Sequence, residues 1–439
     1  MGLYGEKEMK IQYMIGIIIG VILIGSAITF FSLNQPKVSD ENPNDNDSDI
    51  ISDINLSSEM QFHESANNFG FKLLQQFIAN PMYHENPFFS PYSIFTALAM
   101  AYEGAAGNTA VEMAAVLNIQ QDNESFHNYV LDLYNNLNNN TEYNMSTANA
   151  AWIEQDFTIL DQYIRIVENF YQAESTNIDF SNPEQAATII NQWVENNTNN
   201  LIRDLVTADA IDPALTRLIL TNAIYFKGAW EVQFDKENTT DRPFTTSLGE
   251  TIDVPTMSLV GTQDTFYYTE NQDFQMIELP YTGNDLSMII ILPKETRSLS
   301  TFINSITEED YAEWLDTMEK EEVDLYLPKF TITTPLYSIG DMLSNLGIHD
   351  AFTYNADFSG ITGTKDLLIQ YVFHKAFIEV NEEGTEAAAA TAVVMNLLSI
   401  NGGNHSRIVF DCDHPFIYLI QQMETGTILF MGAMGNPTV

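Results

Sequence analysis

Residues 382–399 combine an acidic, glycine-containing entry with a run of very small side chains. The segment follows an apolar and β-branched stretch at 373–380, and turn residues at 401–404 separate it from a second such stretch at 408–410. Both flanking stretches have the composition of β-strands, so the segment connects two predicted strands. Its four alanines would favour a helix by propensity, but that helix would lack an apolar face and would be unstable alone.

The segment could instead be extended, and its side chains would then suit insertion into a β-sheet. In a strand, residues i and i+2 share a face. One face of the segment would then carry Thr385, Ala387, Ala389 and Thr391. All four side chains are small enough to enter a close-packed interior, which would exclude bulky or charged ones. The pattern therefore predicts an exposed loop that can slide between existing strands.

Motifs of the common enzyme classes are missing from the sequence. It contains no Gly-x-Ser-x-Gly nucleophile elbow, no His-Glu-x-x-His zinc motif, no phosphate-binding loop and no dinucleotide glycine fingerprint. The seven histidines are scattered, and His63-Glu64 has no second histidine at helical spacing. Cys412 is the only cysteine, which excludes an internal disulfide and a cysteine metal cluster. The sequence thus offers no candidate catalytic group, metal site or cofactor site.

The charge of the chain is strongly negative. Among 439 residues there are 17 Lys and Arg against 60 Asp and Glu, a formal net charge of -43. So few cations cannot form a broad basic patch, which excludes nucleic acid and heparin-type polyanions as partners. The acidity fits solubility at high salt in a halophilic source and equally fits an ordinary acidic protein, and the sequence leaves both open.

The N-terminal part of the chain divides into three segments before a globular domain at 58–439. Residues 1–12 form an N-terminal cytoplasmic segment, and 13–33 are apolar and long enough to span a bilayer. Their length favours an uncleaved anchor, while small residues at 25–27 leave a cleaved signal peptide as the alternative. Two lysines precede the span, so the C-terminal side is expected outside the cell. Residues 34–57 are a flexible acidic linker.

Within the domain, the apolar periodicity changes from helical in the first half to strand-like in the second. Helices are predicted at 69–78, 92–102, 161–171 and 186–196. Strands are predicted at 217–230, 276–281, 286–293, 323–330 and 367–380. No second linker and no internal repeat interrupts this part, so it is expected to be one domain.

The segment at 382–391 and several other stretches of the chain resemble a known protein family. Residues 382–391 read Glu-Glu-Gly-Thr-Glu-Ala-Ala-Ala-Ala-Thr, which is similar to the hinge of the reactive-centre loop in serpins, the large suicide inhibitors of serine proteases. Further stretches resemble serpin sequence motifs, namely residues 86–94, 217–230 and 413–416. The resemblance therefore extends, in the same order along the chain, from about residue 60 to 439. It implies an α+β serpin fold with about nine helices packed on a large central mixed β-sheet, two further sheets and an exposed reactive-centre loop.

The resemblance also implies roles for individual residues. The hinge comprises Glu382, Glu383, Gly384, Thr385, Glu386, Ala387, Ala388, Ala389, Ala390 and Thr391. The reactive bond joins Leu398 to Ser399, and Trp230 matches the breach tryptophan. The shutter positions, beneath the centre of the sheet, are Ser90, Ser93, Asn222 and His374. Both serines could equally act as helix caps, and His374 is expected to hydrogen-bond to Asn222 and order the sheet.

A serpin of this kind would be an irreversible suicide-substrate inhibitor and no enzyme, since the catalytic residues belong to its target. The partner is then a serine protease held as a covalent acyl-enzyme, with chymotrypsin-, subtilisin- or elastase-like specificity because Leu398 is apolar. The inhibitor is expected to be a monomer on the extracellular face of the membrane, or secreted if the N-terminal segment is cleaved. The alternative is a non-inhibitory serpin that acts as a surface binding or chaperone protein.

Overall fold

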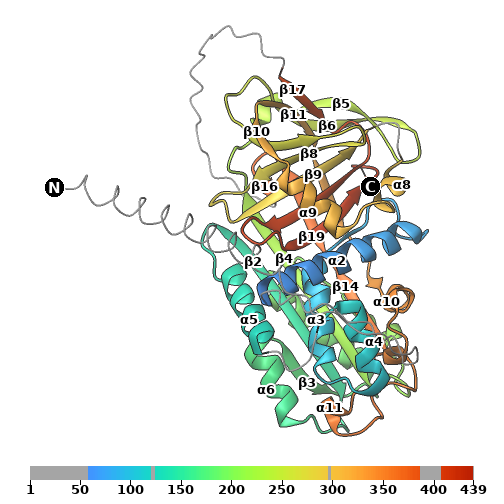
Figure 1. The fold of residues 1–439 in the computed structure, drawn as a ribbon. Helices are drawn as coiled ribbons and strands as arrows, with labels where there is room; N and C mark the ends of the chain where they lie inside the picture. Colours follow the sequence, from blue (N-terminus) through green and yellow to red (C-terminus); the bar gives the residue numbers. More distant parts are fainter. Residues whose placement is uncertain (1–57, 120–123, 295–297, 386–406, 439) are drawn as a thin grey trace, which may run out of the picture. The chain divides into compact units, whose positions relative to one another are not determined.

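Ten α-helices and three β-sheets make up the described part of the chain (Figure 1). The computed structural model describes residues 58–119, 124–294, 298–385 and 407–438, and all of these belong to one compact unit, Leu56–Val439. The architecture is α+β, as predicted, and the ten α-helices of the described residues agree with the expected number of about nine.

The helices alternate with strands in the first half of the chain and are short in the second half. The α-helices are α2 (Ser58–Ala79), α3 (Pro91–Tyr102), α4 (Gly107–Leu117), α5 (Glu124–Asn138), α6 (Asp161–Phe170), α7 (Pro183–Asn197), α8 (Leu299–Ile303), α9 (Glu308–Asp316), α10 (Gly340–Leu346) and α11 (Ser359–Thr362). The single-turn 3-10 helices are η1 (Ala208–Ala210), η2 (Lys236–Asn238) and η3 (Asp350–Phe352).

The central sheet has eight strands among the described residues and is mixed. Its strands are β2 (Tyr143–Glu154), β3 (Glu174–Ile178), β4 (Leu218–Ala229), β12 (Phe330–Thr333), β13 (Tyr337–Ser338), β14 (Tyr371–Lys375), β15 (Phe377–Asn381) and β16 (Gly384–Thr385). The long strand β4 runs antiparallel to β2 and parallel to β14, and β3 lies parallel to β2. This mixed central sheet confirms the predicted arrangement.

Two further sheets accompany the central one, also as predicted. The seven-stranded sheet has the order β1 (Phe88–Phe89), β19 (Ile428–Met434), β18 (Phe416–Gln422), β9 (Leu286–Pro293), β8 (Phe274–Pro280), β7 (Phe266–Glu270) and β10 (Glu319–Glu321). The four-stranded sheet has the order β17 (Ile408–Asp411), β11 (Val323–Pro328), β6 (Thr251–Leu259) and β5 (Thr240–Thr245). In Figure 1 these two sheets fill the upper half of the domain.

Helix α3 lies beneath the centre of the central sheet and is buried along its whole length. Ser90 caps its N-terminus by accepting a hydrogen bond from the Ser93 backbone N–H, and Pro91 occupies the first turn, where no helical N–H is needed. Its residues contact both β2 and β4, and Figure 1 shows it in front of these strands in the lower half of the domain. The helix therefore holds Ser90 and Ser93 against the sheet.

None of the helices in the described ranges is long and apolar enough to cross a membrane. The span predicted at 13–33 and the linker at 34–57 lie outside the described residues. So do hinge residues Glu386, Ala387, Ala388, Ala389, Ala390 and Thr391 and the reactive bond Leu398–Ser399.

Candidate functional site

The first hinge residues already form a strand inside the central sheet. After β15 the chain turns at Glu382 and Glu383, and Gly384 and Thr385 return as β16. On one side Thr385 pairs antiparallel with Val380 of β15. On the other side it pairs antiparallel with Gly228 of β4. In the uncleaved chain, the first residues of the predicted hinge are thus already part of the central sheet.

Below this strand, the described residues form no ladder that joins β4 directly to β15. Strand β14 pairs with β4 as far as Lys375 opposite Ala223, and β16 meets β4 at Gly228. Between Ala223 and Gly228, none of the ladders formed by the described residues joins β4 to β15. A strand continuing from Thr385 in the direction of β16 would run between these two strands.

Close backbone contact at the entry restricts one hinge position to glycine. Gly384 has φ +153°, and a Cβ atom there would stand 2.1 Å from the carbonyl oxygen of Gly228. No side chain fits at that distance, so the hinge approaches β4 this closely only because residue 384 is a glycine.

The Thr385 side chain points into an aromatic wall and is 1% exposed. Its Oγ1 lies 2.6 Å from the hydroxyl of Tyr281, whose ring stacks on Trp230 with centroids 4.6 Å apart. Phe226 meets the same Tyr281 ring edge-on at 4.9 Å. Burial raises the pKa of Tyr281 well above its usual value, so its hydroxyl stays protonated.

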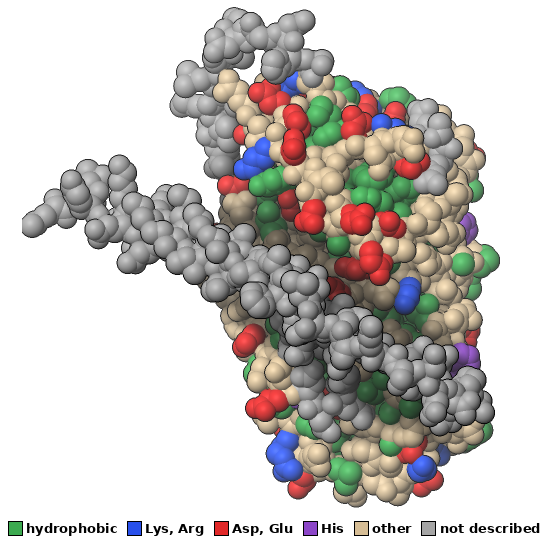
Figure 2. Space-filling view, in the orientation of Figure 1, with side chains coloured by type: hydrophobic (Ala, Val, Ile, Leu, Met, Phe, Trp, Pro, Cys, Tyr) green, Lys and Arg blue, Asp and Glu red, His purple; other side chains and the backbone are tan. Residues whose placement is uncertain are grey.

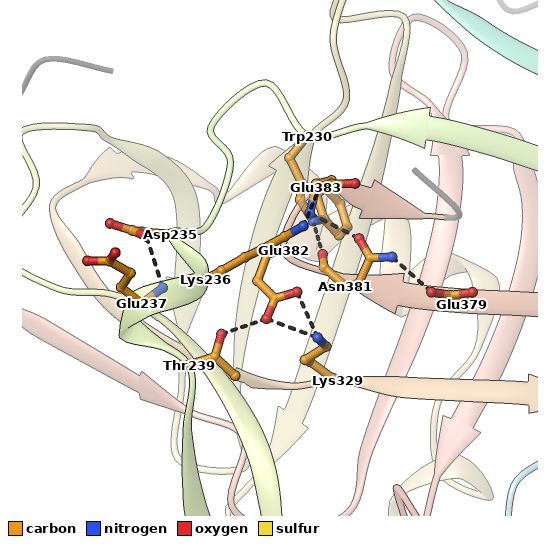
Figure 3. A network of polar contacts seen from close by, with 10 residues as sticks. All are labelled: Trp230, Asp235, Lys236, Glu237, Thr239, Lys329, Glu379, Asn381, Glu382 and Glu383. Atoms are coloured by element: carbon orange, nitrogen blue, oxygen red, sulfur yellow. Dashed lines mark hydrogen bonds and ion pairs between the residues drawn. The ribbon is translucent and has the colours of Figure 1, made fainter. Parts of the chain in front are cut away.

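Trp230 connects this wall to the turn between β15 and β16. Its indole Nε1 donates a hydrogen bond to the Asn381 carbonyl at 2.9 Å, and its backbone N–H donates to the Glu383 carbonyl at 3.0 Å. Both contacts hold the turn rather than the inserting strand (Figure 3). The predicted breach tryptophan therefore lies at the point where the hinge enters the sheet.

Two lysines hold the carboxylates of the same turn, as Figure 3 shows for Lys329 on Glu382. Lys329 lies 2.8 Å from a Glu382 carboxylate oxygen, and Thr239 donates to that carboxylate at 2.7 Å. Burial alone would raise the pKa of Glu382, but the hydrogen bonds from Lys329 and Thr239 bring it below its usual value. Lys236 pairs with Glu383 at 2.6 Å.

These two ion pairs lie in a strongly acidic molecule. Figure 2 shows acidic side chains gathered on the upper half of the face that it presents, with few basic ones between them. Of only 17 Lys and Arg in the chain, two are placed on consecutive hinge carboxylates. The ion pair of the exposed Lys236 with Glu383 contributes little to stability. The Glu382 carboxylate is only 5% exposed, so loss of its partners would leave a buried unpaired charge and destabilise the fold.

The shutter residues meet in one buried hydrogen-bonded network between α3 and the central sheet. His374 on β14 faces Asn222 on β4, and its Nδ1 lies 2.7 Å from the Asn222 side-chain oxygen. The backbone N–H of Ser90 donates to His374 Nε2 at 3.2 Å. The Asn222 amide donates to Ser93 Oγ and, at 2.6 Å, to the side-chain oxygen of Asn149.

This pattern of contacts requires a neutral histidine. With a proton on Nδ1, His374 donates to Asn222 and still accepts from Ser90 through Nε2. Burial lowers the pKa of His374 to about 3. The predicted bond between His374 and Asn222 is present, and the role expected of Ser90 as a helix cap coexists with its place in the network.

The C-terminal end of the loop is held at the four-stranded sheet. Arg407 pairs through Nη1 with Glu322 at 2.6 Å and through Nε with Asp324 at 2.7 Å. Strand β17 then runs parallel to β11, beginning with Ile408 opposite Val323. Residues 386–406 therefore connect two firmly attached points, one in the central sheet and one in the four-stranded sheet.

Several residues of this site were not found from the sequence. Asn149, Tyr281, Thr239, Lys236 and Lys329 all contact the predicted hinge or shutter residues. No group of three or more His, Cys, Asp or Glu in the described ranges could hold a metal ion.

Comparison with known proteins gives consistent similarities. The protein-family profile described as "Serpin (serine protease inhibitor)" matches residues 64–437. A serpin-like protein of Thermococcus kodakarensis is 42% identical over 84% of this chain and 84% of its own length. The crystal structure of a serpin from the insect Tenebrio molitor, described as highly specific, matches with a TM-score of 0.76 and 33% identity over 86% of this chain and 98% of its own. Human thyroxine-binding globulin, solved in a complex with thyroxine, matches with a TM-score of 0.76 and 29% identity over 87% and 99%.

Proposed function

The chain belongs to the serpin family, and from that premise we propose that it is an irreversible suicide-substrate inhibitor of serine proteases. One observation carries the proposal: the start of the hinge already lies in the central sheet as β16, paired with β15 on one side and β4 on the other, and no ladder among the described residues joins those two strands directly. Because insertion of the loop into the sheet has already started, cleavage of the loop would allow the rest of it to follow. The four small hinge residues on one face suit that continuation.

The proposed reaction begins as ordinary proteolysis by the target. The protease serine oxygen attacks the Leu398 carbonyl carbon, the Leu398–Ser399 peptide bond breaks, and the proton leaves with the new Ser399 amine. Leu398 is then esterified to the protease. Thirteen residues, 386–398, follow Thr385 into the sheet and carry the ester about 40 Å at roughly 3.3 Å per residue. Insertion thus competes with hydrolysis of the ester by water.

In this mechanism the protein supplies no catalytic group, metal or cofactor of its own. What it supplies is stored free energy, which is released as the loop gains ladder hydrogen bonds and buries its small side chains. The proposed partner is a serine protease with a hydrophobic primary pocket, and the proposed functional unit is the monomer. Its acidity is consistent with the absence of a polyanion partner.

The alternative is a non-inhibitory serpin, since some members of the family do not inhibit proteases. Such a protein would bind or carry another molecule, as thyroxine-binding globulin does in its complex with thyroxine. No bulky, proline or unmatched charged residue stands among the described hinge residues, where Thr385 is buried and both glutamates are paired. We therefore favour inhibition.

Incubation of the full-length chain with chymotrypsin and with subtilisin is expected to give an SDS-resistant covalent complex. The released C-terminal peptide should begin at Ser399, because Leu398 suits a hydrophobic primary pocket. Trypsin should form no complex with the wild type. As a matched variant, Leu398→Arg should transfer inhibition to trypsin. Cleavage by chymotrypsin without any covalent band would instead support the carrier alternative.

For localisation, we propose that residues 13–33 hold the domain on the extracellular face of the membrane. Fractionation of the native cells should recover the full-length chain in the membrane fraction, and protease added to intact cells should release the domain. A secreted chain lacking residues 1–27 would favour the signal-peptide alternative, and a full-length cytosolic chain would contradict both.

A further inference from the structure

The two hydroxyl groups of Thr385 and Tyr281 face each other in an otherwise apolar pocket. They lie 2.6 Å apart, and the two residues are 1% and 0% exposed. Among the described residues, neither hydroxyl has another side-chain hydrogen-bond partner. A hydroxyl buried among aromatic rings without a partner would be costly, so the pair stabilises the buried position of Thr385.

The walls of this pocket leave Tyr281 little freedom to move. Trp230 stacks on one face of its ring, and Phe226 meets it edge-on. Toward strand β4, a Cβ atom at Gly228 would lie 3.0 Å from the Tyr281 ring and 2.6 Å from Phe226. The ring therefore presses against the backbone of β4 beside the strand entry, and its hydroxyl has a fixed place.

A fixed hydroxyl at this place selects one register for the entering strand. A slip of one residue would bring Gly384, which has no side chain, or Glu386, which is charged, to the position of Thr385. The next residue on the same face, Ala387, has no hydroxyl. Glu386 could accept from the Tyr281 hydroxyl only by burying its charge, so among these four residues only Thr385 offers an uncharged side-chain partner.

We propose that Tyr281 is a positioning residue for loop insertion, which holds Thr385 in the sheet and sets the register before a protease arrives. The proposal rests on the proposed inhibitory function, because it concerns how insertion starts. Without the hydroxyl contact, the hinge leaves the sheet more often, and insertion after cleavage must first find its register. Water then hydrolyses the ester between Leu398 and the protease more often before the cut loop has inserted.

The test begins without any protease, with hydrogen exchange of the intact full-length chain. Tyr281→Phe should raise the exchange rate of the Gly384 and Thr385 amides about three- to ten-fold, the effect of losing one buried hydrogen bond. Thr385→Val should do the same, and the double variant should exchange no faster than either single variant. Thr385→Ser should exchange like the wild type, because the hydroxyl remains.

Tyr311→Phe provides the matched control. Tyr311 is also a buried tyrosine, and its hydroxyl donates to Gln421 on β18, outside the central sheet. This variant should lose thermal stability comparably but leave exchange at Gly384 and Thr385 unchanged. An equal rise in hinge exchange in both tyrosine variants would mean that only general stability changed, and would overturn the proposal.

A second measurement connects the contact to inhibition. With chymotrypsin, Tyr281→Phe should raise the moles of inhibitor consumed per mole of protease inactivated, by up to about five-fold, while cleavage stays at Leu398–Ser399. Tyr311→Phe should not. If hinge exchange rises but inhibitor consumption does not, the positioning role is refuted. If the wild type forms no covalent complex, the proposed function fails, and the exchange result still decides whether Tyr281 holds Thr385.

Discussion

Replacing Thr385 by arginine is expected to turn this protein from an inhibitor into a substrate. The Thr385 side chain is buried against Tyr281, whose ring stacks on Trp230. An arginine there would bring an unpaired charge into a desolvated slot, at a cost of several kcal/mol. Cleavage at Leu398–Ser399 should continue, because the bond lies thirteen residues beyond this position. Insertion should be slow enough for water to release the protease.

The measurement is a comparison of cleaved and complexed inhibitor after reaction with chymotrypsin. Thr385→Arg should give only cleaved product and active protease, whereas Thr385→Ser, which keeps a small hydroxyl, should inhibit like the wild type. The wild type should also gain thermal stability after cleavage, and the arginine variant should gain less. Inhibition by Thr385→Arg at the wild-type level would mean that insertion from this hinge is not the mechanism.

The hinge and the shutter could be located from the sequence because their residues lie in recognisable short sequence motifs. The run around Thr385 is recognisable in order along the chain, and so is the pairing of Asn222 with His374. The sequence does not show which residues contact the hinge and the shutter. Lys329 and Tyr281 come from distant parts of the chain, and only the folded sheets bring them to Glu382 and Thr385.

Strand β2 could not be predicted because its composition does not resemble a strand. The sequence predicts a mainly helical first half of the domain, yet β2 (Tyr143–Glu154) lies beside β4 along eleven residue pairs. Its asparagines and alanines have low strand propensity, and their placement depends on burial and neighbours rather than on the local sequence. Asn149 is one of them, and its side-chain oxygen accepts a hydrogen bond from Asn222.

One predicted strand is divided in the structure because the chain passes from one sheet to another. The stretch predicted at 323–330 leaves the four-stranded sheet after Pro328 and joins the central sheet at Phe330. The intervening Lys329 belongs to neither strand; its backbone N–H donates to the Pro255 carbonyl, and its side chain binds Glu382. Composition alone could not show this division, because both halves are equally strand-like.

Acidification is expected to destabilise the protein through His374. Burial lowers its pKa from 6.5 to about 3, so below pH 6.5 the unfolded chain binds a proton that the folded chain does not. The free energy of unfolding should therefore fall as the pH falls from 6.5 toward 3, at up to about 1.4 kcal/mol per pH unit from this residue. Protonation would also turn Nε2 from an acceptor of the Ser90 N–H into a second donor facing it.

His374→Gln isolates this contribution, since glutamine can donate and accept hydrogen bonds but cannot become charged. Unfolding of both proteins should be followed at pH 7, 6, 5 and 4, and the stability of the wild type relative to the variant should decrease across that series. Other titrating groups act in both proteins and cancel in the difference; one is Glu308, whose pKa burial and then Glu64 raise to about 7. A difference that stays constant from pH 7 to 4 would show that His374 is not held neutral by the shutter. A decreasing difference would show that the folded protein holds His374 neutral between β4 and β14.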